Sequence, residues 1–124
     1  MYLPLHILIA TKQAEKAYGY KYRHGCVIFN GRKIVSKGCN KQRHTPELYK
    51  YGYKRCWLHA ESDAIIKGNP FDMMDAELLV VRLGKTKLSN SKPCAACMSM
   101  IREAGIEKVF YTDATGSFQM IEVW

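Results

Sequence analysis

The sequence AELLVVRLG, residues 76–84, is a nearly continuous apolar run of strand length. A strand with one face in water alternates apolar and polar residues, whereas a strand buried on both faces is apolar almost throughout. The run therefore predicts a strand in the interior of a layered domain. With 124 residues, 48% of them hydrophobic, the chain suits one such domain, residues 1–124, around a single core.

Helix and strand patterns alternate in the first half of the chain. Residues 3–19 carry apolar side chains at helical spacing, which predicts a first helix. Asn30-Gly31 is a strong turn pair between two strand-like segments, because both residues tolerate positive φ, and it predicts a hairpin. A long polar loop follows, and residues 57–68 then predict a helix that ends at Gly68.

The second half of the chain completes the pattern. Pro93 is placed to open a helix and Gly105 to end it. Residues 107–112 and 117–124 predict the last two strands. The whole order of elements predicts an α/β domain with a mixed sheet.

Composition restricts the partners and the compartment. The net charge is +8, from 19 basic and 11 acidic side chains, which indicates an anionic partner such as phosphate, nucleotide or nucleic acid. Five cysteines, with one Cys-x-x-Cys pair, favour a reduced compartment with a metal or redox site over a disulfide framework. The apolar start, residues 2–10, lacks the features of a signal peptide or membrane span, so a cytoplasmic protein without membrane contact is expected.

Three residues have the chemistry and placement of zinc ligands. Cys94 and Cys97 are three apart, so in the first turn of a helix they share a face and can chelate one ion. The positive end of that helix favours thiolates, and His59 can add a nitrogen ligand from the start of another helix. Three protein ligands leave a fourth position for water, whose pKa zinc lowers. Glu61, near that water, can take up its proton and pass it on to a leaving group.

A closed structural site is the alternative. Cys56 and His59 form one pair with two intervening residues, and Cys94 and Cys97 form another, which together give four soft ligands and no open position. Glu61 would then have no role. The apolar strands argue against a fold that needs such a site, and the segment before Cys56 has the composition of a loop.

Two motifs, His59-Ala60-Glu61 and Pro93-Cys94-Ala95-Ala96-Cys97, resemble the H-x-E…P-C-x-x-C signature of zinc-dependent cytidine and deoxycytidylate deaminases. The sequence around the predicted hairpin, ending in Asn40, is similar to the first hairpin of that family. The segment after Cys97 is similar to the helix and strand that follow the cysteines. The resemblance covers roughly residues 20–112.

The resemblance implies an α/β/α sandwich with a central five-stranded mixed sheet. It implies one zinc ion per chain, held by His59, Cys94 and Cys97, with Glu61 as the catalytic proton shuttle. Only 12 residues follow Thr112, which leaves room for a tight turn and a short strand, so an antiparallel last strand is expected. The reaction implied is hydrolytic deamination of a cytosine-containing nucleotide to the uracil form with release of ammonia.

The sequence leaves more than one class of substrate possible. The loop between Asn40 and His59 is rich in basic and tyrosine side chains, which suit either a single-stranded nucleic acid or one nucleotide phosphate. Deoxycytidine monophosphate is the favoured substrate. Single-stranded DNA, RNA or tRNA is the alternative, and a non-enzymatic zinc-binding nucleotide sensor is a third hypothesis. A homo-oligomer is expected, and the candidate substrate contacts are Asn40, Ala60, His24, Trp57 and Tyr111.

Overall fold

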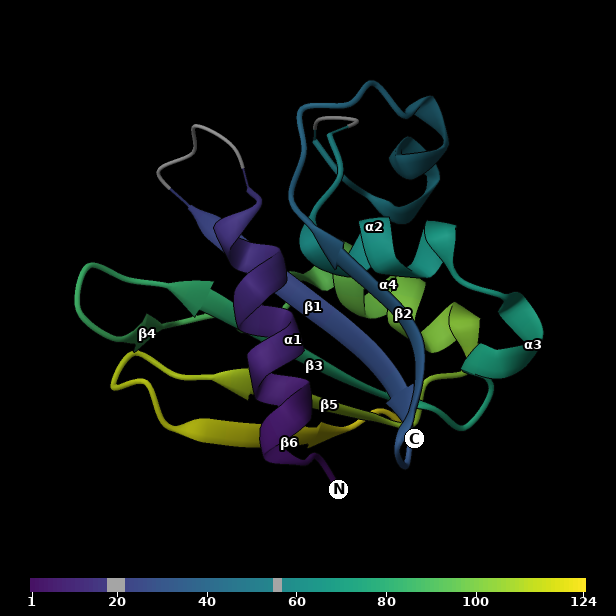
Figure 1. The fold of residues 1–124 in the computed structure, drawn as a ribbon. Helices are drawn as coiled ribbons and strands as arrows, with labels where there is room; N and C mark the ends of the chain where they lie inside the picture. The colour runs from purple at the N-terminus through teal and green to yellow at the C-terminus, as the bar shows by residue number, and fades with distance from the viewer. Residues whose placement is uncertain (18–21, 55–56) are drawn as a thin grey trace.

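The computed structural model describes residues 1–17, 22–54 and 57–124, which form a sheet between two layers of helices (Figure 1). The helical elements are α1 (Pro4–Glu15), the 3-10 helix η1 (Pro46–Tyr51), α2 (Ala60–Lys67), α3 (Pro70–Met73) and α4 (Ala95–Ala104). The strands are β1 (Arg23–Asn30), β2 (Lys33–Cys39), β3 (Glu77–Leu83), β4 (Leu88–Ser89), β5 (Lys108–Thr112) and β6 (Phe118–Glu122). No helix within the described ranges is both long and apolar enough to cross a bilayer.

The sheet is mixed, with the strand order β2-β1-β3-β5-β6 and the short β4 paired to β3. All neighbouring pairs are antiparallel except β3 and β5, which are parallel and are joined through α4. The prediction of five main strands with an antiparallel last strand is confirmed, because β6 folds back along β5. The two-residue β4 was not predicted.

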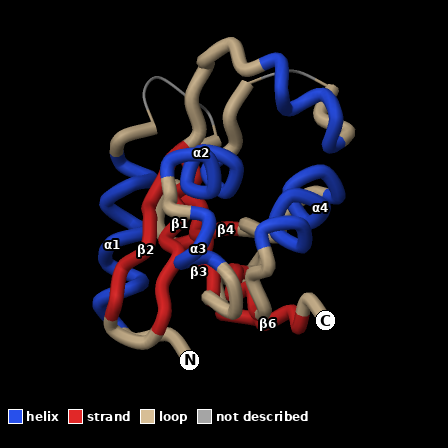
Figure 2. The backbone as a smooth tube through the Cα atoms, turned by 90° about the vertical axis from the view of Figure 1, so that its right-hand side faces the viewer, coloured by secondary structure: helices blue, strands red, loops and turns tan. Residues whose placement is uncertain are grey.

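The helices cover both faces of the sheet, so the predicted α/β/α sandwich is confirmed. In Figure 2, α1 lies on one side of the strands and α4 on the other. Side chains of β3 alternate between the two cores. Leu79 and Val81 pack with α1, whereas Leu78 and Val80 pack in the cluster with α2 and α4. The apolar run is therefore a central strand that is buried on both faces.

Several predicted element boundaries differ from those of the structure. The helix predicted over residues 3–19 is Pro4–Glu15, with residues 18 and 19 outside the described part, and the helix predicted over residues 57–68 is Ala60–Lys67. The last strand, predicted over residues 117–124, is Phe118–Glu122. Asn30 still pairs with Lys33, so the hairpin loop is Gly31-Arg32, with Gly31 at φ 58°. Pro93 does not open the second long helix. Cys94 is the N-cap and Ala95 the first helical residue, because the Cys94 sulfur can accept a hydrogen bond from the Cys97 backbone N–H. Gly105 ends that helix as predicted, at φ 87°.

Two glycines allow helices to lie directly on the hairpin. A side chain on Gly25 of β1 would overlap the backbone of Ala10 and Ala14 in α1. A Cβ atom on Gly38 of β2 would lie 2.6 Å from the Ala64 nitrogen and 2.8 Å from the Ala60 oxygen in α2. The position of both helices, and so of the residues at their ends, depends on these close approaches.

A buried carboxylate fixes α2 further. Asp63 is 1% exposed, and its Oδ2 accepts a hydrogen bond from the Cys39 backbone N–H at 3.1 Å. The same carboxylate forms ion pairs with Lys41 at 3.1 Å and Lys67 at 3.2 Å. The end of β2 and the first turn of α2 are thereby joined.

A second buried network fixes the segment before Cys94. The Ser91 hydroxyl donates to the Val80 carbonyl and accepts from the Thr112 backbone N–H, both at 2.8 Å. The Ser91 backbone N–H also donates to the Thr112 carbonyl at 2.8 Å. The chain that leads into α4 is therefore held between the middle of β3 and the end of β5.

We predict that Gly25→Ala lowers the free energy of unfolding by about 1–3 kcal/mol or more, as overpacking of a backbone contact does. The smaller chain entropy of alanine in the unfolded state offsets only about 0.4–1 kcal/mol of this loss. Urea unfolding followed by circular dichroism measures the difference. Gly68→Ala is the matched control, since its nearest contact is the flexible end of Met73. Equal stability of Gly25→Ala and the wild type would contradict the close approach.

Candidate metal centre

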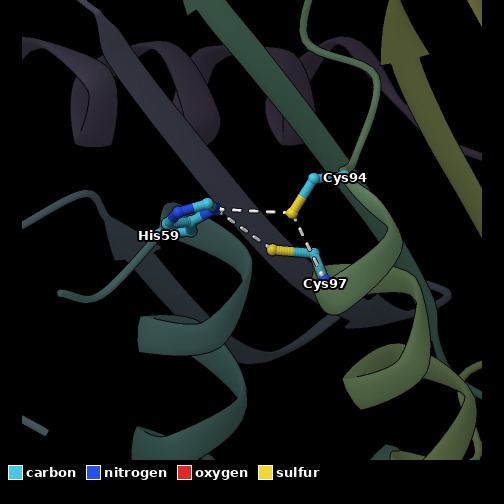
Figure 3. A group of neighbouring side chains, drawn as sticks. All are labelled: His59, Cys94 and Cys97. Atoms are coloured by element: carbon cyan, nitrogen blue, oxygen red, sulfur yellow. Dashed lines mark hydrogen bonds between the residues drawn. The ribbon is translucent and has the colours of Figure 1, made fainter. Parts of the chain in front are cut away.

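Two helices begin next to each other and carry the candidate metal ligands (Figure 3). His59 is the N-cap of α2, and Cys94 is the N-cap of α4. The backbone of His59 is extended, at φ −81° and ψ 165°, and its N–H donates to the Ser62 hydroxyl at 2.8 Å. This capping arrangement ends the preceding loop at His59, whose imidazole then points toward α4.

The distances between the candidate ligand atoms fit zinc. The His59 Nδ1 lies 3.4 Å from the Cys97 sulfur and 3.8 Å from the Cys94 sulfur, and all three atoms lie within 4.8 Å of one another. A nitrogen about 2.0 Å and a sulfur about 2.3 Å from one tetrahedral zinc ion are about 3.5 Å apart. One nitrogen and two soft sulfur donors are also a donor set that zinc prefers. The three residues could therefore hold this ion without rearrangement.

The surroundings of Cys94 and Cys97 favour a negatively charged thiolate in this pair. The hydrogen bond from Cys97, aided by His59, lowers the pKa of the Cys94 thiol to about 4, although burial acts in the opposite direction. The same sulfur contact, together with burial, raises the pKa of Cys97. One thiolate is thus present at neutral pH before any cation binds, and a bound cation favours the second.

Tyr53 contacts two of the three candidate ligands, which the sequence did not predict. Its hydroxyl lies 2.8 Å from the Cys97 sulfur, and its ring meets the His59 ring edge to face at 4.8 Å. Burial and the neighbouring Cys97 raise the pKa of the phenol, so Tyr53 stays protonated and donates to a Cys97 thiolate. The two residues are 44 positions apart, and no local spacing relates them.

Glu61 lies in the first turn of α2, two residues after His59, and is only 4% exposed. Burial raises the pKa of its carboxyl group, partly countered by a hydrogen bond from backbone and by His59. A carboxyl group with a raised pKa can both take up and release a proton near neutral pH. Glu61 therefore has the character of a general acid and base rather than of a permanent anion.

A cavity of about 800 Å³ opens over these residues. This volume is within the range of pockets that hold small molecules. The lining includes His59, Glu61 and Cys94. The remaining walls come from the start of β1, the loop after β2 and the segment before α4: Tyr22, His24, Asn40, Lys41, Gln42, Gly52, Tyr53, Lys54, Trp57, Leu58, Ala60, Ser91, Lys92, Ala95 and Ala96.

Four of the five predicted substrate contacts line this cavity: His24, Asn40, Trp57 and Ala60. The fifth, Tyr111, lies elsewhere. Its side chain packs against the core cluster between the sheet and α4, and it is not among the described residues of the cavity wall. Tyr111 follows Val109 on the same face of β5, and that face is covered by α4.

Two of the lining residues have fixed roles in the wall. The Asn40 carboxamide accepts from the His24 backbone N–H at 2.8 Å and donates to the Tyr22 carbonyl at 2.9 Å, which holds the start of β1 against the end of β2. Burial, with the charges of Arg82 and His59, lowers the pKa of His24 to about 4, so its imidazole is neutral at pH 7. Neither residue adds charge to the cavity.

The alternative ligand Cys56, and Arg55 beside it, lie outside the described residues. The described part of the chain groups His59, Cys94 and Cys97 alone as a metal-binding cluster. The closed four-ligand site therefore stays a hypothesis to be tested by substitution.

Comparisons with known proteins agree with this geometry. A sequence model described as "Cytidine and deoxycytidylate deaminase zinc-binding region" matches residues 5–113. A deoxycytidylate deaminase of Mycobacterium phage D29 is 28% identical over 121 residues, covering 83% of this chain and 88% of the relative.

Solved structures share the fold. A cytidine deaminase from Burkholderia pseudomallei superimposes with a TM-score of 0.70 at 22% identity, covering 99% of this chain and 94% of that one. A dCMP deaminase from the cyanophage S-TIM5, in complex with dCMP and dUMP, gives a TM-score of 0.61 at 20% identity, covering 92% and 85%.

We predict that Tyr53→Phe weakens zinc binding about 10–100-fold, as the loss of a hydrogen bond to a ligand does. Competition with a chromophoric chelator measures the affinity, and the absorption of the cobalt-substituted protein reports the thiolate environment. Tyr51→Phe is the matched control, because its hydroxyl donates to Glu103 instead of to a ligand.

Unchanged zinc affinity in Tyr53→Phe, with an unchanged cobalt spectrum, would show that the hydroxyl does not act on the metal centre. In the same assay Cys56→Ala is expected to retain wild-type affinity. Loss of zinc from Cys56→Ala would instead support the closed site.

Proposed function

Because the chain belongs to the family of zinc-dependent cytidine and deoxycytidylate deaminases, we propose that it converts deoxycytidine monophosphate to deoxyuridine monophosphate and ammonia. The observation that supports this most directly is the buried Glu61 carboxyl group in the same cavity wall as His59 and Cys94. The deoxycytidylate deaminase of phage D29 supports the choice of substrate, since this chain matches 88% of its length.

His59, Cys94 and Cys97 would hold one zinc ion per chain. When bound there, zinc supplies Lewis acidity, which makes water a nucleophile at neutral pH. His59 contributes a neutral imidazole through Nδ1, and the two sulfurs contribute as thiolates. Tyr53 donates to Cys97 and limits the charge on that sulfur.

Glu61 moves the protons of the reaction. It removes a proton from the attacking water and delivers it to the ring nitrogen next to C4 of cytosine. It then takes the proton of the hydroxyl group newly bonded to C4 and transfers it to the amino group, which leaves as ammonia while the C4 carbonyl forms. Its raised pKa suits both directions of transfer, because the carboxyl group is neither a strong acid nor a permanent anion in this buried position.

The loop 40–58 supports a free nucleotide over a single strand. Three of the residues that could follow a polynucleotide have partners within the protein: Lys41 binds Asp63, Tyr51 binds Glu103 and Tyr53 binds Cys97. Leu48, Tyr53 and Leu58 are buried against α4. The loop thus packs as a wall of the cavity instead of presenting a row of open aromatic faces.

A homo-oligomer is also part of the proposal. Exposed large apolar side chains support it, among them Phe71 at 88% and Trp124 at 70% exposure. Sedimentation equilibrium tests it directly, and a monomer at micromolar concentration would rule it out.

We expect Glu61→Gln to lower kcat about 10²–10⁴-fold, as the loss of a general acid–base group does, while zinc content and fold stay unchanged. Glu122→Gln, an exposed change on β6, is the control. Ammonia release coupled to an indicator enzyme measures turnover, and metal analysis measures zinc. Turnover of Glu61→Gln within threefold of the wild type would refute the assigned role.

A substrate panel separates the three functional hypotheses. We expect ammonia release from deoxycytidine monophosphate with a weak salt dependence, a few-fold between 50 and 200 mM, because one phosphate is bound by few cations. A cytosine-containing 20-mer that neutralises about five phosphates would lose roughly 100-fold over the same range. Steeply salt-dependent turnover of the 20-mer alone would identify a nucleic-acid deaminase. Nucleotide binding without ammonia release would identify a sensor.

A further inference from the structure

A second cavity, of about 380 Å³, lies where β3 ends beside the start of β1. Its charged lining residues are Arg23, Arg82 and Lys85, and none of the described residues that line it is acidic. Three cations around one hollow repel each other unless an anion enters. Positive charge thus gathers in this wall without a compensating carboxylate among its described lining residues.

Arg82 points toward the same face of the sheet as the metal centre. Leu78 and Val80 of β3 pack on the α2 and α4 side, and strand alternation places Arg82 on that side as well. In the antiparallel register Arg82 lies opposite His24, whose side chain therefore shares its face. His24 lines the metal-centre cavity, so Arg82 stands directly behind that wall.

Tyr22 connects the two cavities. Tyr22 is one of the residues that line the metal-centre cavity, and the Arg82 guanidinium carbon lies 4.4 Å from the centre of its ring. Stacking on an aromatic ring fixes the guanidinium plane and leaves its N–H edge available for two parallel hydrogen bonds. This edge is the part of arginine that matches a phosphate group.

The positive charge of Arg82 is not used in an ion pair within the described residues, so it could bind a phosphate group. None of the ion pairs within residues 1–17, 22–54 and 57–124 involves it. Arg23 in the same wall donates to the Glu15 carbonyl at 2.7 Å, so part of its hydrogen-bonding capacity is already used, although its charge remains. Burial lowers the pKa of His24 in the other cavity, and the positive charge of Arg82 adds to this effect.

We propose that Arg82, stacked on Tyr22 and assisted by Lys85, binds the phosphate of a nucleoside monophosphate whose base occupies the metal-centre cavity. This assignment rests on the proposed function and deepens it, since it names the residue that distinguishes nucleotide from nucleoside. The phosphate of a polynucleotide has the same chemistry, and the experiment separates the two sources.

The test compares kcat/KM for deoxycytidine monophosphate and deoxycytidine in the wild type and in Arg82→Gln. We expect the preference for the monophosphate to fall about 10–100-fold in Arg82→Gln, because a charge-assisted bidentate contact is lost. Arg82→Lys keeps a charge without the planar fork, so an intermediate preference is expected. Arg102→Gln, an exposed change on α4, is the matched control and should keep the wild-type preference.

Calorimetry of deoxycytidine monophosphate, deoxycytidine and the cytosine-containing 20-mer binding to Glu61→Gln, with and without Arg82→Gln, gives a readout that does not depend on turnover. Weaker binding of the monophosphate alone to the variant with Arg82→Gln would support the phosphate site. Absence of ammonia release from the wild type would refute the proposed function, and it would not change the result for the phosphate site. An equal loss for nucleotide and nucleoside, or an unchanged preference in a folded, zinc-loaded Arg82→Gln protein, would overturn the proposal. An effect confined to the 20-mer would overturn the assignment to a free nucleotide.

Discussion

Strand direction determines where the functional residues meet. β2 and β3 both pair antiparallel with β1, so they run in the same direction and end at the same edge of the sheet. The chain then leaves each strand toward a helix that starts at that edge, which places the N-caps His59 and Cys94 side by side. β1 begins at the same edge and contributes His24. Crevices at the carboxyl ends of strands are the usual binding sites of α/β sheets, and this fold follows the rule although its sheet is mixed.

Electrostatics adds to the topology. Two helix N-termini point into one cavity, and each presents unpaired N–H groups and a partial positive charge. The backbone N–H of Cys97 lies 3.5 Å from the Cys94 sulfur, and the Tyr53 hydroxyl lies 2.8 Å from the Cys97 sulfur. Thiolates, a carboxyl group and an anionic ligand are all stabilised in such a field.

The sequence predicted those parts of the molecule that depend on local patterns. The apolar run of β3 predicted a strand buried on both faces, and the three-residue spacing of Cys94 and Cys97 predicted a shared helical face. The length of chain after Thr112 predicted the antiparallel last strand. Each of these inferences uses residues within a single element or turn.

What the sequence did not predict depends on contacts between distant segments. Tyr53 contacts Cys97, which lies 44 positions further along the chain. The pairing of β1 with β3 places Arg82 next to Tyr22. Tyr111 illustrates the same point, because its packing in the core cluster under α4 depends on contacts outside β5. Pro93 marked the right region but not the first helical residue, since the Cys94 sulfur takes the capping position.

The contact of Tyr53 with Cys97 links the wall of the cavity to the metal centre. Loop 40–58 is closed at its base by pairing of Lys41 with Leu58, and its interior packs on α4 through Leu48 and Tyr53. One phenol therefore belongs to the substrate wall and to the environment of the ligands at the same time. Coupling between two binding events is reciprocal, so a substrate that raises the affinity for zinc through this contact would have its own affinity raised by zinc by the same factor. A cell with abundant nucleotide would thus keep the enzyme loaded at lower free zinc than a cell in which the nucleotide is scarce.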